Sequence, residues 1–322
     1  MNKWQVSSLY CLRQKHSTAK RGDMGITSLK WPSSWLREMT AIAGAALIAS
    51  LPATVARAST EAEPTQLTET VPNALNVSQF PGASFCPNHL DAAINAIVNR
   101  PQFATANWGI VIAPLSYETE LYTHHSENFL IPASNVKLLT TAAAVQIIGE
   151  RSPQTLPRFR EQLDVINRHS NNARADELLR TIGGQHAVRV ALSSLGVSPD
   201  GYQQVDGSGL SRSNKAKPSA FVSLLKAMHY EDQSRIFYNS LPVGGVNGTL
   251  RNRFKGTLAQ GKVHAKTGTL RGVRALSGYL ETTDYGTVAF SIVVNQPGQT
   301  GSVLLRAIDE MVLQIARVEN CG

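Results

Sequence analysis

The segment from Asn135 to Ile148 limits the fold more than any other part of this 322-residue chain. Apolar side chains occupy nearly every side of a helix drawn through it, at Val136, Leu138, Leu139, Ala142, Ala143 and Val145. A helix that is apolar all round must be covered on all sides, so this segment predicts the central helix of a domain. Lys137 lies within the same helix, and we therefore expect its amine to be buried.

Shorter apolar patterns on both sides of this helix predict the other elements. Helices are expected at 88–98, 173–182, 185–195, 218–229 and 303–316, and strands at 108–112, 120–122, 263–267, 275–280 and 287–294. Strands at both ends with helices between them predict an α+β domain. We expect one antiparallel sheet formed from both chain ends, with a helical region inserted between them.

The N-terminal segment has the features of an export signal. Lys30 and Arg37 precede an apolar run at 41–51, which is too short to span a bilayer. Ala56-Arg57-Ala58 then provides the small-x-small pattern at which such signals are cleaved. We therefore expect residues 1–58 to be a signal peptide or leader, in a protein exported to the periplasm or cell envelope without a stable transmembrane anchor.

The formal charge of +8 is concentrated in this leader. Residues 1–58 hold eight Lys/Arg and two Asp/Glu, which leaves 23 basic and 21 acidic residues, a net charge of +2, for the remainder. So small a net charge argues against a nucleic-acid partner. Residues 59–84, rich in Thr, Glu and Pro, predict a flexible lead-in, and 85–322 are expected to form the folded domain.

The start of the central helix carries a candidate catalytic pair, Ser134 and Lys137. Three residues apart on one helical face, a hydroxyl and an amine come close enough for proton transfer, provided that burial lowers the lysine pKa. A serine at a helix N-terminus also has a backbone N–H directed at a developing oxyanion. The spacing alone is not specific, because Ser17 with Lys20 and Ser223 with Lys226 share it.

A second candidate motif, Ser170-Asn171-Asn172, begins another helical segment. Its serine suits proton relay to a leaving amine, and Asn172 suits a hydrogen bond to a substrate amide. The same pattern occurs at Ser126-Glu127-Asn128, where a helix cap is a sufficient explanation.

Lys266-Thr267-Gly268-Thr269 is the third motif and ends a predicted strand. Gly268 lets a substrate backbone approach the strand edge, while Lys266 and Thr267 offer a charge and a hydroxyl to a carboxylate. Each motif alone also fits an ordinary cap or turn. Together and in this order they form the motif set of penicillin-binding proteins and serine β-lactamases.

The sequence around the motifs resembles the D-alanyl-D-alanine carboxypeptidase/endopeptidase family of low-molecular-mass, class C penicillin-binding proteins. The similar segments include IPASNVKLLTTAAA at 131–144, INRHSNNARADELL at 166–179, DGSGLSRSN at 206–214 and much of 240–279. The resemblance implies a β-lactamase/transpeptidase-like fold. It also implies a serine-type D-Ala-D-Ala carboxypeptidase, or endopeptidase, that acts on peptidoglycan stem peptides, is acylated by β-lactams and needs no cofactor.

Carried over residue by residue, the resemblance assigns a role to each motif. Ser134 would be the acylated nucleophile, Lys137 its general base and Ser170 the proton relay toward the departing D-alanine. Asn172 would orient the substrate.

The third motif would hold the end of the substrate. Lys266 with Thr267 would bind its terminal carboxylate at the strand edge that Gly268 leaves open. The backbone N–H groups of Ser134 and Thr269 would form the oxyanion hole. Asp206, Ser208 and Asn214 belong to a further family motif, for which the sequence suggests no physical role.

One departure from the family pattern concerns length. Family members usually carry two extra domains between the first and second motifs, whereas only 32 residues separate Lys137 from Ser170. We expect those domains to be absent and the Ser134 helix to lack a packing cover. Two alternatives stay open: a β-lactamase-like serine hydrolase, although no E-x-x-L-N segment follows the second motif, and an inactive peptidoglycan-binding homologue.

Two further residue pairs, one of cysteines and one of histidines, bear on disulfide and metal chemistry. Cys86 and Cys321 are the cysteines left after the leader, and an oxidising compartment predicts a disulfide between them, with two free thiols as the alternative. His124-His125 adjoins a predicted strand, where neighbouring side chains point to opposite faces. We therefore expect a surface pair and no metal site there.

Overall fold

The computed structural model describes residues 86–231 and 234–320. The predicted leader at 1–58, the lead-in at 59–84 and Cys321 lie outside the described residues, so the export signal and the pairing with Cys86 stay predictions. No helix within the described ranges is long and apolar enough to cross a membrane.

One five-stranded antiparallel sheet organises the domain. Its strand order is β2-β1-β7-β6-β5, so β5 lies at one edge and strands from both chain ends pair in the middle, with Ile110 opposite Ile292. This confirms the predicted α+β fold. The strands are β1 (Asn107–Pro114), β2 (Tyr122–His124), β5 (Val263–Leu270), β6 (Val273–Glu281) and β7 (Thr287–Asn295), and β3 (Tyr202–Gln203) pairs with β4 (Lys215–Ala216) separately.

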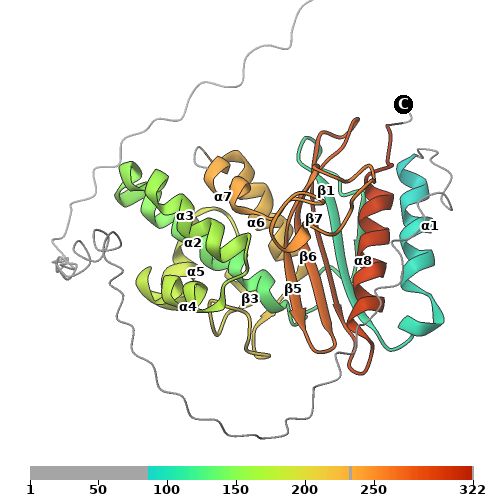
Figure 1. Cartoon of the computed structure of the whole chain (residues 1–322), viewed down its shortest axis with the longest axis horizontal. Helices are drawn as coiled ribbons and strands as arrows, with labels where there is room; N and C mark the ends of the chain where they lie inside the picture. The colour runs from blue at the N-terminus through green and yellow to red at the C-terminus, as the bar shows by residue number, and fades with distance from the viewer. Residues whose placement is uncertain (1–85, 232–233, 321–322) are drawn as a thin grey trace, which may run out of the picture. The chain divides into compact units, whose positions relative to one another are not determined.

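Helices cover both faces of this sheet (Figure 1). On one face lie α1 (Pro87–Val98) and α8 (Gly301–Ile315), and on the other lies the helical region. Successive residues of β1 supply the two cores, since Ile110 and Ile112 belong to the α1–α8 core and Val111 to the other. The helical region contains α2 (Val136–Arg151), α3 (Leu156–Asn167), α4 (Asn172–Thr181), α5 (Gly184–Ser194), α6 (Pro218–Tyr230) and α7 (Ser234–Ser240).

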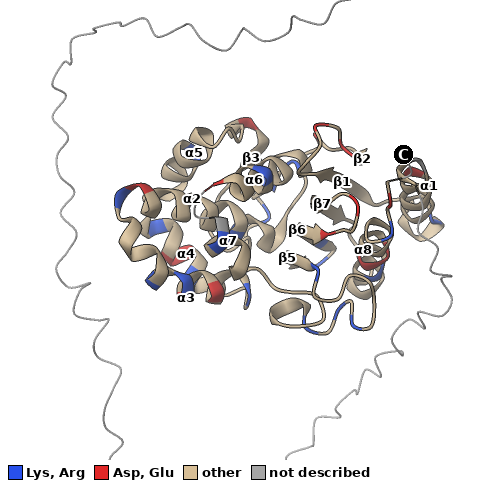
Figure 2. Ribbon diagram, turned by 90° about the horizontal axis from the view of Figure 1, so that it is seen from above, with Lys and Arg blue, Asp and Glu red and all other residues tan. Residues whose placement is uncertain are grey.

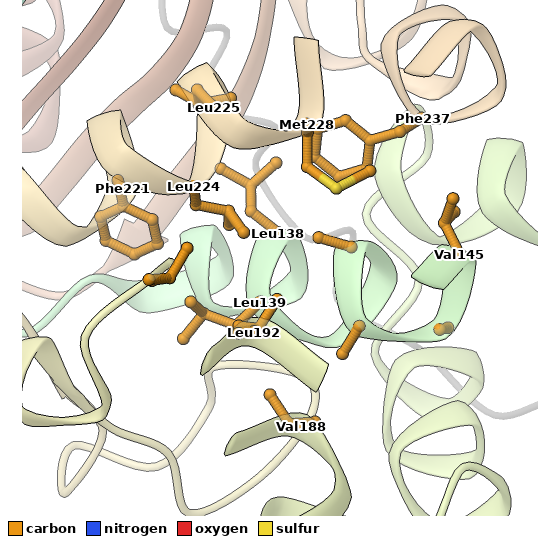
Figure 3. Packing of buried hydrophobic residues seen from close by; sticks show 14 of the residues in the cluster. Leu138, Leu139, Val145, Val188, Leu192, Phe221, Leu224, Leu225, Met228 and Phe237 are labelled. Carbon is orange, nitrogen blue, oxygen red and sulfur yellow. The ribbon is translucent and has the colours of Figure 1, made fainter. Parts of the chain in front are cut away.

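Helix α2 is the centre of the helical region. Figure 3 shows its Leu138, Leu139 and Val145 surrounded by side chains of α5, α6 and α7. Leu138 is fully buried and Leu139 is 1% exposed. The expected loss of a packing cover is therefore wrong, because α3, α5, α6 and α7 all contact α2.

Helix α3 was missed by the sequence analysis. It lies between the first and second motifs, after the single turn Pro153–Thr155. Its buried residues Leu156, Phe159, Leu163 and Ile166 do fall at helical spacing, so the signal was present. Helix α7 was missed as well, because its seven residues are too few to show a helical period in the apolar positions.

The surface of the described domain carries both signs of charge. Basic and acidic residues are interspersed over the helices (Figure 2). The His124 and His125 rings lie 4.2 Å apart, which corrects the expectation that they point to opposite faces. His125 lies beyond the end of β2 with φ of 47°, so the strand alternation does not extend to it. Among the described residues, no group of three or more His, Cys, Asp or Glu side chains could hold a metal ion.

Candidate active site

The three motifs come from separate elements and meet between the helical region and the edge strand β5. Ser134 lies in a single 3-10 turn, Ala133–Asn135, which runs directly into α2. Ser170 precedes α4 and Asn172 begins it, while Lys266 lies within β5. The turn that holds Ser134 packs against β5 and β6.

The buried side chain of Asn135 fixes that turn to the sheet. Its Nδ2 donates to Ser277 Oγ at 2.7 Å, and Ser277 Oγ is 2.8 Å from Ser291 Oγ. Gly268 allows β5 to lie close to the start of this turn, because a Cβ at residue 268 would be 2.6 Å from Pro132 O. The position of Ser134 relative to the strand edge is thus set by the buried polar contacts of Asn135 and by the absence of a side chain at Gly268.

The amine of Lys137 is held by three acceptors. Nζ lies 3.0 Å from Ser134 Oγ and 2.8 Å from Asn172 Oδ1, and it also donates to Ser208 O. A protonated amine has three donors, so the charged form is fully satisfied. When one proton leaves, the two remaining N–H bonds can stay on Asn172 and Ser208, and the lone pair then faces the Ser134 hydroxyl.

Burial lowers the pKa of Lys137 from its usual 10.5 to about 8, while the charges of Asp176 and Asp206 act in the opposite direction. The side chain is fully buried. At pH 7, a group with this pKa is neutral in roughly a tenth of molecules, enough to act as a base. The burial expected from the apolar pattern of α2 is confirmed, and its consequence is an amine that can accept a proton near neutral pH.

Lys266 is also fully buried and reaches Ser170. Its Nζ donates to Ser170 Oγ at 2.8 Å and to Thr267 O at 3.1 Å. Burial, together with the nearby charge of Lys137, holds the pKa of Lys266 well below its usual value. The second and third motifs are therefore joined by a direct hydrogen bond, which the sequence did not predict.

Beyond Ala265, the edge of β5 that faces away from β6 is suited to binding an extended chain. Ala265 N–H donates to Pro242 O, away from β6, at 3.0 Å. In an antiparallel strand alternate residues face the same partner, so the N–H groups of Thr267 and Thr269 also point away from β6. Thr267 Oγ1 donates to Thr249 Oγ1 at 2.8 Å, a neighbour that sequence reasoning did not identify. Thr269 is exposed, and its N–H points away from β6, which is compatible with the oxyanion-hole role predicted for it.

The loop 206–214 now has a physical role. Asp206 accepts hydrogen bonds from the N–H groups of Gly209 at 2.6 Å and Ser211 at 2.7 Å. Gly209 lies against the turn that carries Ser134, because a Cβ on it would be 2.0 Å from Ala133 O. The loop therefore presents the Ser208 carbonyl to Lys137 Nζ.

Asp176 fastens the same loop to α4. Its Oδ1 accepts the N–H groups of Gly207 at 2.9 Å and Ser208 at 2.8 Å. The sequence analysis did not identify Asp176. Its spacing of four residues from Asn172 on one helix was a usable signal, since it places a carboxylate on the face that meets the buried amine.

Asn214 ties the loop together, so its removal tests this role. Its side chain is fully buried, accepts from Val205 N–H at 2.7 Å and donates to Asp206 Oδ1 at 2.9 Å and Ser211 O at 2.9 Å. Asn214→Ala would leave several of these groups unpaired, so we expect the free energy of unfolding to fall by about 3 kcal/mol. Urea unfolding measures this fall.

The matched control is Asn128→Ala, which removes an exposed asparagine from the unused Ser126-Glu127-Asn128 pattern. Its stability should stay within about 0.5 kcal/mol of the wild type. Equal stability of the two variants would contradict the role given to Asn214.

Two non-glycine residues at the site have left-handed backbone. Ala133 has φ of 49° and Ser170 has φ of 55°. Such conformations cost of order 1 kcal/mol or more and persist where the surrounding structure enforces them. Here one precedes Ser134 and the other is the second-motif serine itself, so strain is concentrated at the motifs.

The fold is shared with solved serine β-lactamases. The TLA-1 extended-spectrum β-lactamase superposes with a TM-score of 0.59 at 17% identity, over 72% of this chain and 100% of that structure. The chain is thus a protein of the β-lactamase-like fold in which Ser-x-x-Lys, Ser-x-Asn and Lys-Thr-Gly motifs converge.

The chain belongs to the D-Ala-D-Ala carboxypeptidase 3 (S13) family, whose model matches residues 90–156 and 154–318. The two matched segments overlap at residues 154–156, between the first and second motifs. A D-alanyl-D-alanine carboxypeptidase of Actinomadura sp. (strain R39) is 41% identical over 178 residues, which is 50% of this chain and 32% of that protein. The penicillin-sensitive carboxypeptidase A of Dictyostelium discoideum is 30% identical over 180 residues, 50% of this chain and 34% of that protein. The chain therefore spans about a third of the length of these curated relatives.

Proposed function

We propose that this protein is a serine-type D-Ala-D-Ala carboxypeptidase that acts on peptidoglycan stem peptides through an acyl-enzyme on Ser134. The observation that carries the proposal is the arrangement at Lys137 Nζ, where two fixed acceptors direct the lone pair of the neutral amine at the Ser134 hydroxyl. A binding protein has no need for such a pair. The names of the relatives support the same chemistry.

The acylation step uses residues of the first motif. Ser134 Oγ attacks the carbonyl carbon between the two D-alanines while its proton passes to Lys137 Nζ, 3.0 Å away. The N–H groups of Ser134 and Thr269 stabilise the negative charge that develops on the carbonyl oxygen. Asn172 orients the substrate amide beside them.

Expulsion of the terminal residue uses the second motif. The C–N bond breaks as the nitrogen receives a proton through Ser170, whose hydroxyl accepts a hydrogen bond from Lys266 Nζ. Lys137 replaces the proton that Ser170 gives up, and free D-alanine leaves. Water then attacks the Ser134 ester while Lys137 takes the water proton. The bond from Ser134 Oγ to the acyl carbon breaks, Lys137 returns that proton to Oγ, and the shortened peptide leaves as a carboxylic acid.

The proposal is tested with two substrates. A pentapeptide ending in D-Ala-D-Ala should lose its terminal D-alanine, whereas nitrocefin should acylate the protein about once and turn over slowly. Rapid nitrocefin turnover without D-alanine release would instead establish a β-lactamase-like hydrolase. Peptide binding without release of D-alanine or acylation would establish an inactive peptidoglycan-binding homologue. A cross-linked dimer of stem peptides tests for endopeptidase activity in the same assay.

We also propose that the protein is exported and works in the periplasm or cell envelope, where its substrate lies. Residues 1–58 support this as a signal peptide with a cleavage pattern at Ala56-Arg57-Ala58. In that compartment Cys86 and Cys321 would form a disulfide. The N-terminal sequence of the mature protein, and its mass with and without reduction, test both statements.

A further inference from the structure

A pocket opens on the α8 side of β5. It has a volume of about 170 Å³ and is lined by Thr249, Arg253, Thr267, Gly268, Thr269, Arg274, Ala275, Leu305 and Ile308. At roughly 30 Å³ for each water-sized group, this space holds a carboxylate with a few attached carbons. Its wall includes the third motif, so it adjoins the strand edge to which the proposed function assigns the end of the substrate.

The charges in this pocket are not balanced. Arg253 Nε donates to Asp309 Oδ1 at 2.9 Å, and the two side chains are only 12% and 18% exposed, so this guanidinium is neutralised. Arg274 donates instead to two backbone carbonyls, Leu270 O at 2.9 Å and Val273 O at 2.8 Å. Within 86–231 and 234–320 it forms no ion pair, and the pocket lining contains no acidic residue. A net positive charge is therefore left for an anion.

The pairing of β5 with β6 places the Arg274 side chain on the same face of the sheet as the threonines of the third motif, and all three residues line this pocket. Thr269 and Arg274 are direct cross-strand partners, so their side chains lie on one face of the sheet. Thr267 is two residues from Thr269 and shares that face, whereas Lys266 points to the other. Lys266 is fully buried and its amine is already bonded to Ser170 Oγ and Thr267 O.

We infer that Arg274, rather than Lys266, supplies the positive charge that recognises the terminal carboxylate of the substrate, with the Thr269 hydroxyl as a hydrogen-bond donor. The inference rests on the proposed function, because it concerns the free carboxylate of a peptide cleaved at Ser134. Leu305 and Ile308 provide an apolar wall for the alanine methyl group. Lys266 is left to position Ser170.

Gly301 gives an independent means of moving this guanidinium. It is the first residue of α8, and a Cβ there would lie 1.6 Å from Arg274 Nη2 and 2.4 Å from Cζ. Since the clashing atoms are the far end of a flexible side chain, Gly301→Ala should displace the guanidinium without disturbing the core. The substitution changes the position of the charge, whereas Arg274→Gln removes it.

The test compares two substrates that differ only in the terminal charge. For the wild type, kcat/KM is measured on an N-acylated peptide ending in D-Ala-D-Ala and on the same peptide with a terminal carboxamide. Arg274→Gln should lower the carboxylate-to-carboxamide ratio by roughly tenfold to a hundredfold, the usual effect of losing a hydrogen bond to a charged group. Gly301→Ala should lower the same ratio, and Arg271→Gln, at an exposed arginine outside the pocket lining, should leave it unchanged.

A second ratio compares the rate of acylation by benzylpenicillin with the rate of acylation by its methyl ester. It also reports recognition of the carboxylate, and measuring it requires no peptidase activity. If the wild type releases no D-alanine, the proposed function fails, yet a penicillin-to-ester ratio that falls in Arg274→Gln and Gly301→Ala still supports the role of Arg274. If D-alanine is released and both ratios stay unchanged in the two variants, the inference is overturned. A wild type that reacts with neither substrate nor penicillin overturns both. Thermal melting of each variant verifies that it is folded.

Discussion

Ser134→Ala is expected to abolish covalent labelling by penicillin and to lower kcat for D-alanine release by a factor on the order of 10⁵ to 10⁶, as removal of the nucleophile does in other serine hydrolases. The fold should persist, because Lys137 keeps Asn172 Oδ1 and Ser208 O as acceptors. Mass spectrometry of the penicillin-treated protein measures the adduct, and peptide mapping locates it.

The chain contains its own control for this experiment. Ser223 and Lys226 repeat the Ser-x-x-Lys spacing on α6, where Ser223 is exposed. Ser223→Ala should be labelled at the wild-type rate and should release D-alanine normally. An adduct that survives in Ser134→Ala would remove the basis of the proposed mechanism, whatever the fold.

The comparison of the two Ser-x-x-Lys pairs shows what the sequence could predict. The apolar residues around Lys137 predicted a buried helix, and burial is what lowers its pKa. Ser223 and Lys226 have the same spacing on α6, but Ser223 is exposed and Lys226 is only partly buried. The order of the motifs separated the two pairs, because Ser223 follows Ser170, and the strand patterns at both chain ends predicted one sheet.

The contacts between motifs could not be predicted in the same way. The bonds from Lys137 to Asn172 and from Lys266 to Ser170 join residues 35 and 96 positions apart, and they depend on how α4 and β5 pack against α2. The role of Asp206 was invisible for a related reason: it acts on backbone N–H groups, and loop backbone direction is not encoded in a pattern of side chains. The resemblance supplied the identity of the motifs, and the packing supplied their connections.

The second large effect concerns the base. Lys137→Met should lower the acylation rate by about 10²- to 10⁴-fold, the usual contribution of general base catalysis. The wild-type rate should also depend on pH. With a Lys137 pKa of about 8, the neutral form makes up roughly a tenth of molecules at pH 7 and roughly nine tenths at pH 9, so acylation should accelerate several-fold over this interval and then level off.

Lys137→Met should lose this rise, and Lys226→Met on α6 should keep it. Stopped-flow acylation by benzylpenicillin between pH 6 and pH 10 gives the profiles. A wild-type rate that is flat across this range, or an inflection that survives in Lys137→Met, would mean that another group accepts the Ser134 proton. A merely structural lysine would slow the reaction without changing the shape of the profile.

Stability gives a readout of the same ionisation that does not depend on turnover. Because the folded-state pKa of about 8 lies below the usual 10.5, the unfolded chain binds more protons between these values. The cost of burying the charged amine, about 3 kcal/mol, is therefore fully present below pH 8 and is relieved as the pH rises toward 10.5. The unfolding free energy of the wild type should increase relative to that of Lys137→Met across this window. If the difference in unfolding free energy between the wild type and Lys137→Met stays constant, folding does not lower the pKa of Lys137, and Lys137 cannot be the base near neutral pH.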